Sequence, residues 1–481
     1  MEIMQDFIGR DEMLKRLNAL WRKRAPSLIT CRGRRRIGKS TLIEEFARRT
    51  ADNLISIDGQ APGDGINNAV QLKSFAQQLS AQTSAPDVKL DNWMQAFKLL
   101  DNALPKSGRT VLLLDEISWL GGYDRTFVGT LKIAWDKLFK KHDDLVVVLC
   151  GSVSSWIAKN LLKSTGFAGR DSLDLVVDEI PLAECPAFWG EAGKRITLSE
   201  KIDILSVTGG VPKYLEELDT SVSAEENLRR LCFTPEGLLF RDFEQIFSRM
   251  YGSKYEERKR LIKAVAYGSK SPAQIAEAIG IERNGHLVEH LDDLVLAGFL
   301  AKDENINPET GKPSRIAKYR LRDNYLRFYL HHIEPVEREI RQGNFQFSGL
   351  SELKGWESIK GLQFENLVAS NYRALLPILG IDGANIKSAA PFRRDADGTE
   401  RGVQIDLMIR TENCAYIVEV KRRNRIEEAV AAELDEKIRR LGLPSCVSVR
   451  TALVYDGEIA SSLRTERKFD FLIPVERLFD R

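Results

Sequence analysis

The chain has 481 residues, of which 43% are hydrophobic and 29% charged, with 16 prolines and 34 glycines. This composition is typical of globular proteins and excludes a collagen-like, mucin-like or mostly disordered chain, and the length favours about three domains. The 71 basic and 69 acidic residues balance to +2, so net charge does not identify a nucleic-acid partner. The apolar runs are too short to span a bilayer and residues 1–6 lack the pattern of a secretory signal, so we expect a cytoplasmic protein that binds no membrane. Six isolated cysteines predict reduced thiols rather than zinc or redox chemistry.

Residues 27–177 alternate short apolar runs with longer helical stretches, which predicts an α/β fold with a parallel sheet. The runs are apolar throughout, as in strands that are buried on both faces. Residues 198–330 are predicted to be helical, with one strand near 316–321, and the last block returns to mixed α/β structure. The expected strands are 27–31, 54–57, 110–114, 145–150, 173–177, 403–410, 415–421 and 447–455, and the expected helices include 40–49, 69–82, 93–104, 126–140, 363–376 and 427–441.

Residues 33–40 match the phosphate-binding pattern G-x-x-x-x-G-K-[ST] between a predicted strand and a predicted helix. Glycines let the backbone amides wrap a phosphate, the lysine reaches the β- and γ-phosphate oxygens, and the serine hydroxyl ligates Mg²⁺. The pattern therefore predicts an ATP and Mg²⁺ site. The residues assigned to it are Gly33, Gly38, Lys39, Ser40 and Thr41.

The apolar run 111–114 ends in Asp115 and Glu116, which supply the acidic half of such a site. We expect Asp115 to hold Mg²⁺ through water and Glu116 to orient or deprotonate the attacking water. The alternative, that both acids only cap the next helix, leaves their occurrence together with the phosphate-binding loop unexplained. Ser152, just after the run 145–150, either senses the γ-phosphate or caps a turn.

Residues 5–335 resemble the archaeal-type ATPases of the AAA/STAND assemblage, because five motifs occur in that family's order. The motifs are residues 7–12, 33–39, 115–116, 150–152 and 209–215. The resemblance implies that Gly9 and Arg10 lie near the adenine or ribose, and that Gly210 and Pro212 belong to a helical lid over the nucleotide. It places Arg170 at the γ-phosphate, with a surface salt bridge as the alternative. We also expect an ATP-dependent homo-oligomer.

Residues 256–321 predict a winged helix-turn-helix, with three helices followed by a wing at 302–321. The start of the third helix is placed to reach DNA base edges and the wing to touch phosphates. Acidic residues on the same helix disfavour DNA, so an interdomain module is the alternative. The candidate DNA contacts are Arg283, Asn284, His286, Lys312 and Arg315, and the opposing acids are Glu289, Asp292 and Asp293.

The strands 403–410 and 415–421 predict a hairpin in which Asp406 lies opposite Glu419. Opposed carboxylates destabilise a sheet unless a cation neutralises them, and Mg²⁺ or Mn²⁺ bound by Asp406 and Glu419 would do so. Lys421, expected opposite Gln404, would position or help deprotonate the attacking water.

This pattern is similar to the PD-(D/E)xK nuclease fold, with Ile405 where the name-giving proline would stand. The order of helix, hairpin and helix strengthens the resemblance, as does the fusion of this ATPase family to a nuclease-like domain (the domain-of-unknown-function 234 type). The resemblance places Glu365, Asp406, Glu419 and Lys421 at the catalytic positions. Six arginines supply positive charge for a phosphate backbone or form a solvated rim: Arg393, Arg394, Arg401, Arg422, Arg423 and Arg425.

The expected domains are a P-loop ATPase (1–195), a helical lid (196–250), a winged helix-turn-helix (251–342) and a restriction-endonuclease-like α/β domain (343–481). The expected function is ATP binding and hydrolysis that controls a Mg²⁺-dependent DNA endonuclease. The alternative is a nucleotide-dependent switch that binds DNA or protein and whose nuclease-like domain is catalytically silent.

Overall fold

The structure is a computed structural model that describes residues 7–480, apart from 153, 165, 168, 252–254, 283, 307–312 and 397–400. Arg283 and Lys312 therefore lie outside the described residues, as does the side chain of Arg315. The chain forms two compact units. The first contains the residues up to Glu179 together with Gln245–Glu256 and Leu296–Gly298, and the second contains the remainder. No helix within the described ranges is long and apolar enough to cross a bilayer.

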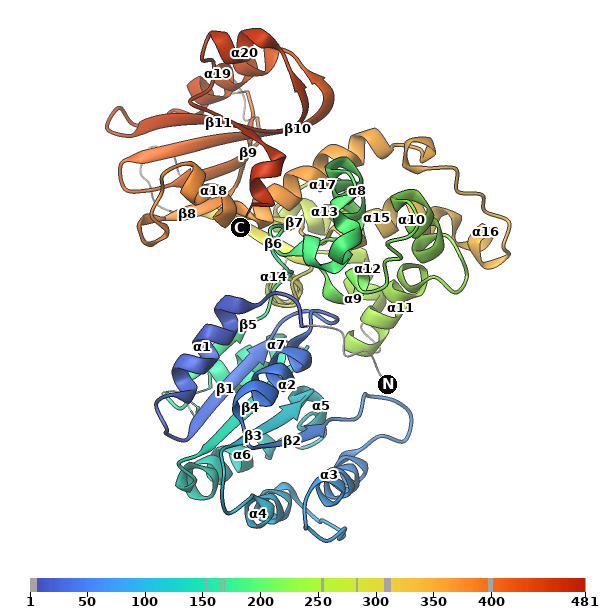
Figure 1. The fold of residues 1–481 in the computed structure, drawn as a ribbon, viewed down its shortest axis with the longest axis vertical. Helices are drawn as coiled ribbons and strands as arrows, with labels where there is room; N and C mark the ends of the chain where they lie inside the picture. Colours follow the sequence, from blue (N-terminus) through green and yellow to red (C-terminus); the bar gives the residue numbers. More distant parts are fainter. Residues whose placement is uncertain are drawn as a thin grey trace. The chain divides into compact units, whose positions relative to one another are not determined.

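The first unit is built on a five-stranded parallel sheet with the strand order β2-β3-β4-β1-β5 (Figure 1). All five strands form where the apolar runs predict them, so the predicted α/β parallel sheet is confirmed. The strands are β1 (Ser27–Arg32), β2 (Asn53–Asp58), β3 (Thr110–Asp115), β4 (Leu145–Gly151) and β5 (Leu173–Val176). The helices are α1 (Asp11–Trp21), α2 (Lys39–Thr50), α3 (Asn68–Gln82), α4 (Trp93–Ala103), α5 (Ile117–Leu120), α6 (Phe127–Lys137) and α7 (Ser154–Ile157).

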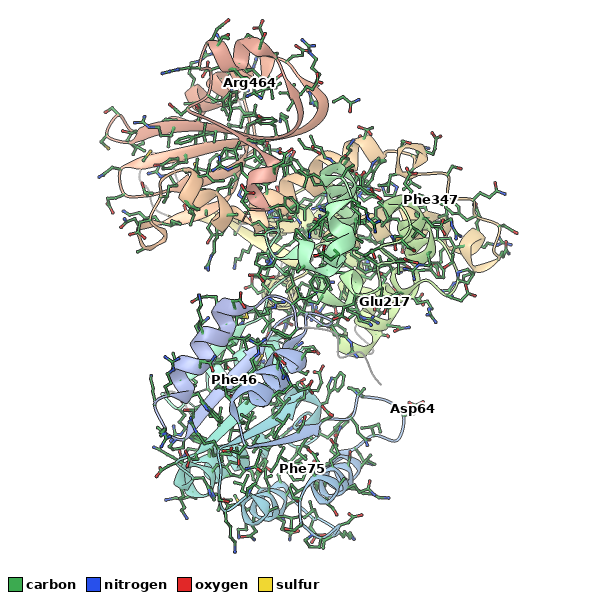
Figure 2. All side chains as sticks on the ribbon, viewed as in Figure 1. Phe46, Asp64, Phe75, Glu217, Phe347 and Arg464 are labelled. Atoms are coloured by element: carbon green, nitrogen blue, oxygen red, sulfur yellow. The ribbon has the colours of Figure 1, made fainter. Side chains whose placement is uncertain are left out.

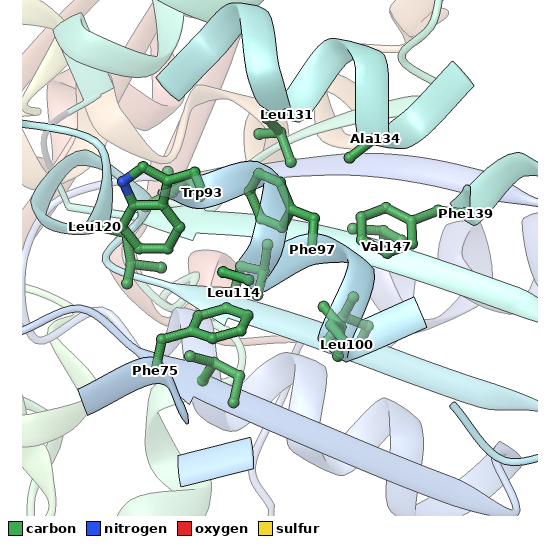
Figure 3. Packing of buried hydrophobic residues seen from close by; sticks show 14 of the residues in the cluster. Phe75, Trp93, Phe97, Leu100, Leu114, Leu120, Leu131, Ala134, Phe139 and Val147 are labelled. Atoms are coloured by element: carbon green, nitrogen blue, oxygen red, sulfur yellow. The ribbon is translucent and has the colours of Figure 1, made fainter. Parts of the chain in front are cut away.

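Aromatic side chains pack both faces of this sheet. On one side, Phe46 of α2 (labelled in Figure 2) meets Trp21 of α1 edge to face, with ring centroids 5.4 Å apart. On the other, Trp93 of α4 meets Phe127 of α6 with ring centroids 4.8 Å apart, and the same cluster includes Leu112 of β3. Figure 3 shows Trp93 and Leu114 of β3 within this cluster. This packing fixes the direction of β3 and therefore the position of the acidic residues that follow Leu114.

The helical segment 198–341, most of which belongs to the second unit, contains all three helices that were predicted for the helix-turn-helix. The first strand of the predicted wing, β6, was missed, because the segment carries Lys302, Asp303 and Glu304 and few residues that favour strands. The helices are α8 (Leu198–Thr208), α9 (Pro212–Leu215), α10 (Ala224–Cys232), α11 (Leu238–Tyr251), α12 (Tyr255–Ala264), α13 (Pro272–Ile279), α14 (Gly285–Leu296), α15 (Asn324–Phe328) and α16 (Glu337–Arg341), and the strands are β6 (Leu300–Ile306) and β7 (Pro313–Leu321).

The C-terminal part of the second unit is a five-stranded mixed sheet with the order β12-β11-β10-β9-β8. Strand β9 runs antiparallel to both β8 and β10, whereas β10, β11 and β12 are parallel to one another. The strands are β8 (Ser388–Arg394), β9 (Val403–Arg410), β10 (Cys414–Ile426), β11 (Ser448–Ile459) and β12 (Phe471–Pro474), and the helices are α17 (Trp356–Ser370), α18 (Tyr372–Ile378), α19 (Ala429–Leu441) and α20 (Ser461–Thr465). The predicted helix 363–376 is therefore two helices, and β8 and β12 were not predicted.

Helices cover both faces of this sheet (Figure 1). Phe364 and Val368 of α17 pack with Val418 and Val420 of β10, whereas α19 packs against Ile417 and its neighbours on β9 and β11. Alternate residues of a strand point to opposite faces, so Glu419 shares the α19 face with Ile417. The packing thus sends the Glu419 side chain toward α19.

The β9–β10 register is the one expected, as the pair Leu407 and Val418 shows. The ladder ends at that pair, so the expectation that Asp406 and Glu419 form the next pair was wrong. The expected pairing of Gln404 with Lys421 also fails, because both residues lie beyond the end of the β9–β10 ladder. The carboxylate of Asp406 accepts a hydrogen bond from the Val420 amide at 2.9 Å and so replaces the ladder at this point.

Candidate functional sites

The phosphate-binding loop closes tightly at the end of β1. A Cβ on Gly33 would lie 2.1 Å from the Val177 carbonyl oxygen, so only glycine fits there. Gly38 precedes α2 with φ 78°, a left-handed conformation that favours glycine. The Lys39 side chain is buried, and its Nζ donates to the Arg34 carbonyl oxygen at 3.0 Å. A phosphate oxygen can therefore compete for an ammonium that is already held inside the loop.

Ser40 and Asp115 meet across the carboxyl end of the sheet, where the Ser40 hydroxyl donates to Asp115 Oδ2. Glu116 has a left-handed backbone (φ 45°, ψ 48°). Its carboxylate accepts hydrogen bonds from the Ser152 amide at 3.1 Å and from the Ser152 hydroxyl at 2.9 Å. The structure therefore brings Asp115 to the loop, and Ser152 fixes the orientation of Glu116. The predicted catalytic and γ-phosphate roles of these residues stay predictions.

Two further carboxylates near this site were missed by the sequence analysis. Burial, followed by the charge of Asp115, raises the pKa of Glu44 on α2 and the pKa of Asp58 at the end of β2. The β2–β3 pairing places Asp58 beside Asp115, and helical spacing places Glu44 one turn after Ser40. Only the strand pairing could have identified Asp58. This accumulation of negative charge suits a site that receives a divalent cation together with a nucleotide.

The remaining predicted nucleotide contacts are spread over both units. Arg10, with φ 67°, is buried and donates to the Ile37 carbonyl oxygen at 3.0 Å, which ties the segment with Gly9 to the phosphate-binding loop. Thr41 is exposed on α2. Pro212 opens α9 in the second unit, and its contact with nucleotide stays a prediction.

Arg170 forms a bidentate salt bridge with Asp136 of α6, at 2.9 and 3.0 Å. The hydrogen bond from Arg170 is the main cause that lowers the pKa of Asp136. The structure thus contains the salt bridge that was named as the alternative, and a γ-phosphate role for Arg170 stays a prediction.

Residues 7–218 match a family model described as an ATPase domain predominantly from Archaea. The chain therefore carries an archaeal-type ATPase domain. This confirms the prediction of an ATP-binding and ATP-hydrolysing domain, whereas the roles of its individual residues stay predictions. The match ends at residue 218, so it assigns nothing to the later segments.

Over most of its length the chain is also similar to a protein of Methanocaldococcus jannaschii described as uncharacterised, with 23% identity over 451 residues, 91% of this chain and 93% of the relative. Among solved structures, a Walker-type ATPase of Pyrococcus abyssi has a TM-score of 0.49 at 17% identity and covers 68% of this chain and 97% of its own. The ORC2 protein of Aeropyrum pernix, solved as ADPNP–ADP complexes, has a TM-score of 0.41 at 14% identity, with coverages of 71% and 97%.

The second candidate site lies at the divergence of β9 and β10, where two buried carboxylates meet a lysine. Lys421 Nζ is 2.6 Å from Glu419 Oε1 and 3.7 Å from Asp406 Oδ2. The Glu419 side chain is 1% exposed and that of Asp406 is 4% exposed. The structure thus gathers these three predicted site residues, although Asp406 and Glu419 are not a ladder pair.

A second lysine, which the sequence analysis missed, completes this cluster. Lys437 of α19 places Nζ 2.7 and 2.8 Å from the two carboxylate oxygens of Glu419. Nothing in the local sequence distinguishes Lys437 from the other charged residues of its helix, because the contact depends on how α19 packs across β10.

Burial and repulsion between carboxylates raise the pKa values of Glu365 and Asp406. Burial, followed by the charge of Asp406, raises the pKa of Glu365 to about 8. Burial, followed by the charge of Glu419, raises the pKa of Asp406 to about 6. Burial alone would lower the pKa of Lys421, but Asp406 and Glu419 outweigh it and raise that pKa. The charges of Asp406 and Glu419 thus both act on Glu365.

These oxygen donors fit a hard divalent cation in their chemistry. Mg²⁺ is commonly held by one or two carboxylates with water in the remaining positions. Over the described part of the chain, no three His, Cys, Asp or Glu side chains are close enough to share a metal. Asp406 and Glu419 would thus supply two ligands and solvent the rest.

The expected phosphate contacts are only partly available. Arg422 is buried and paired with Asp203 at 2.7 Å and with Asp456 at 2.8 Å, so the expectation that it faces a phosphate backbone was wrong.

An acidic residue of α14 is also engaged within the fold. Asp292 accepts from Lys302 at 3.1 Å and from the Tyr319 hydroxyl at 2.8 Å. The negative charge of Asp292, which counted against DNA binding by α14, is therefore partly neutralised within the fold.

Proposed function

We propose that this chain is an ATPase whose nucleotide state controls Mg²⁺-dependent DNA cleavage by its C-terminal α/β domain. The observation that supports cleavage is the burial of Asp406 and Glu419 around Lys421. Buried charges oppose folding, and a buried ion cluster with perturbed pKa values is more typical of a functional site than of a structural one. The arrangement of α17, three antiparallel strands, α19 and a parallel strand supports the nuclease-like fold.

In the proposed reaction, bound Mg²⁺ would supply Lewis acidity at the scissile phosphate. Asp406 and Glu419 would hold the cation. The Lys421 ammonium, between the two carboxylates, orients the attacking water. Glu365, whose raised pKa keeps a proton on it near neutrality, can exchange that proton with the reacting oxygens.

The same proposal divides the chain into four domains. Residues 1–195 are the ATPase domain, 196–250 the lid, 251–342 a winged helix-turn-helix and 343–481 the nuclease-like domain. Lys39, Ser40 and Asp115 bind ATP and Mg²⁺, Glu116 activates water, and Ser152, Arg170, Gly9, Arg10 and Pro212 complete the nucleotide site. The winged helix-turn-helix binds DNA, and ATP drives assembly into a homo-oligomer.

A second function is favoured by one observation. Lys437 and Lys421 already neutralise Glu419 without a metal ion. A cluster that is satisfied in this way suits a silent domain, and the protein would then be a nucleotide-dependent switch that binds DNA or protein.

The test incubates the purified full chain with supercoiled plasmid or labelled single-stranded DNA in Mg²⁺ or Mn²⁺, with and without ATP. Glu419→Gln is isosteric and should abolish cleavage, whereas Glu357→Gln changes an exposed glutamate of α17 and should not. Lys39→Ala should remove ATP hydrolysis and the ATP dependence of cleavage. Intact ATP hydrolysis with no cleavage of either substrate would favour the switch.

A further inference from the structure

A cavity of about 220 Å³ in the second unit opens onto the candidate cleavage site. Glu365 of α17 and Asp406 of β9 contribute to its lining. The facing wall comes from the predicted helix-turn-helix and the segments that follow it. Two residues of that wall, Tyr267 and Arg327, point to the kind of ligand.

The cavity wall carries a buried cation with unused hydrogen-bonding capacity. Arg327 is 5% exposed, and its guanidinium donates to Gln363 Oε1 at 2.7 Å and to the Leu321 carbonyl oxygen. Its Nε has no hydrogen-bond partner among the residues that the structure describes. Burial lowers the pKa of Arg327 to about 10, so it remains charged at neutral pH. A buried guanidinium with a free N–H beside a cavity suits an anionic group such as a phosphate.

An aromatic ring stands at the opening. Tyr267 lines the cavity and yet is 75% exposed, so its ring lies where the cavity meets solvent. The edge-to-face contact with His331, with ring centroids 4.0 Å apart, supports the ring from one side. An exposed, supported aromatic ring beside cationic groups is the arrangement on which unpaired bases stack.

We propose that this cavity binds one unpaired nucleotide, so that the substrate class is single-stranded DNA; this inference rests on the proposed cleavage by Asp406 and Glu419. Tyr267 stacks on a base, Arg327 receives a phosphate, and the strand continues toward Asp406. The cavity of about 220 Å³ is smaller than the roughly 300 Å³ at which small-molecule pockets begin, so it has room for one base and not for a base pair. A duplex reaches the carboxylates only after a nucleotide leaves the stack.

The test measures binding of the full chain to a labelled oligo(dT) 12-mer and to a labelled 12-base-pair hairpin, by fluorescence anisotropy in EDTA. The wild type should bind the single strand at least about tenfold more tightly than the hairpin. Tyr267→Ala should weaken single-strand binding by about 5- to 150-fold, the range for one base stack. Tyr267→Phe, which keeps the ring, and Tyr123→Ala, which changes an exposed tyrosine of the first unit, should not.

Equal affinity for both ligands, or unchanged binding by Tyr267→Ala, would overturn the inference. Adding Mg²⁺ to the same complexes separates it from the proposed function. Single strand that is bound through Tyr267 but not cut supports the nucleotide site and counts against the nuclease. Cleavage that prefers duplex, or that is unaffected by Tyr267→Ala, supports the nuclease and overturns the single-strand inference.

Discussion

Lys437 of α19 donates hydrogen bonds to both carboxylate oxygens of Glu419, at 2.7 and 2.8 Å, and Lys421 donates to one of them at 2.6 Å. The Glu419 side chain is 1% exposed, so its charge depends on these two ammonium groups rather than on water. The contact joins a helix to the strand that it covers and links the stability of the C-terminal domain to its candidate active site.

Lys437→Met should therefore lower the free energy of unfolding by about 2–4 kcal/mol, because it removes one partner of a buried charge. The double variant with Glu419→Gln should regain at least half of that loss. Denaturant unfolding of the two single variants and the double variant gives the coupling energy. Lys354→Met, at an exposed position, is the control. Additive effects of the two substitutions would contradict this account.

Ser152→Ala should lower kcat for ATP hydrolysis about tenfold and leave the Kd for ATP unchanged. The substitution removes the hydrogen bond from the Ser152 hydroxyl to Glu116 and keeps the one from the backbone amide of residue 152. The Glu116 carboxylate is therefore less firmly oriented. Steady-state hydrolysis and equilibrium binding of a fluorescent ATP analogue measure the two quantities separately. A weaker Kd with an unchanged kcat would instead assign Ser152 to nucleotide binding.

Gly210→Ala should destabilise the protein by about 2–3 kcal/mol, as expected for a forced overlap in a packed region. A Cβ there would lie 2.1 Å from the Ile180 carbonyl oxygen, and the backbone amide of Ile180 donates to the Gly210 carbonyl oxygen. Thermal unfolding measures the change. Gly285→Ala is the matched control, because a Cβ at Gly285 meets nothing within 4 Å. Equal melting temperatures for the two variants would show that the overlap is relieved without cost.

His332 gives the protein a pH-dependent contribution to stability. Burial, followed by the charge of His331, lowers the pKa of His332 to about 4, whereas an unfolded histidine titrates near 6.5. The unfolded chain therefore takes up this proton first, and the stabilisation that is present above pH 6.5 is lost as the pH falls toward 4. Between pH 7 and pH 5 the wild type should lose about 2 kcal/mol relative to His332→Phe.

Denaturant unfolding at several pH values tests this difference, with the exposed His286→Gln as the control. Parallel pH profiles for the wild type and His332→Phe would show that His332 does not contribute to the pH dependence.

The sequence determined the ATPase half of the fold closely. Runs of apolar residues are unambiguous when a strand is buried on both faces, and the phosphate-binding loop fixes where β1 ends and α2 begins. The C-terminal half was predicted less completely. β12 has four residues, β8 includes Pro391 and two arginines, and α17 begins before the expected helix, so local propensity alone did not identify them.

The sequence by itself determined which residues carry charge and in what order they follow each other along β9 and β10. Only the tertiary structure decided their partners. Arg422 turned from an expected phosphate contact into a buried ion pair, and Asp406 bonded to the Val420 amide instead of extending the ladder. Lys437 of α19, which lies 18 residues after Glu419 in the chain, donates a hydrogen bond to it. Ion pairs and hydrogen bonds depend on distances of a few ångströms, and those distances are set by how helices pack on sheets rather than by spacing along the chain.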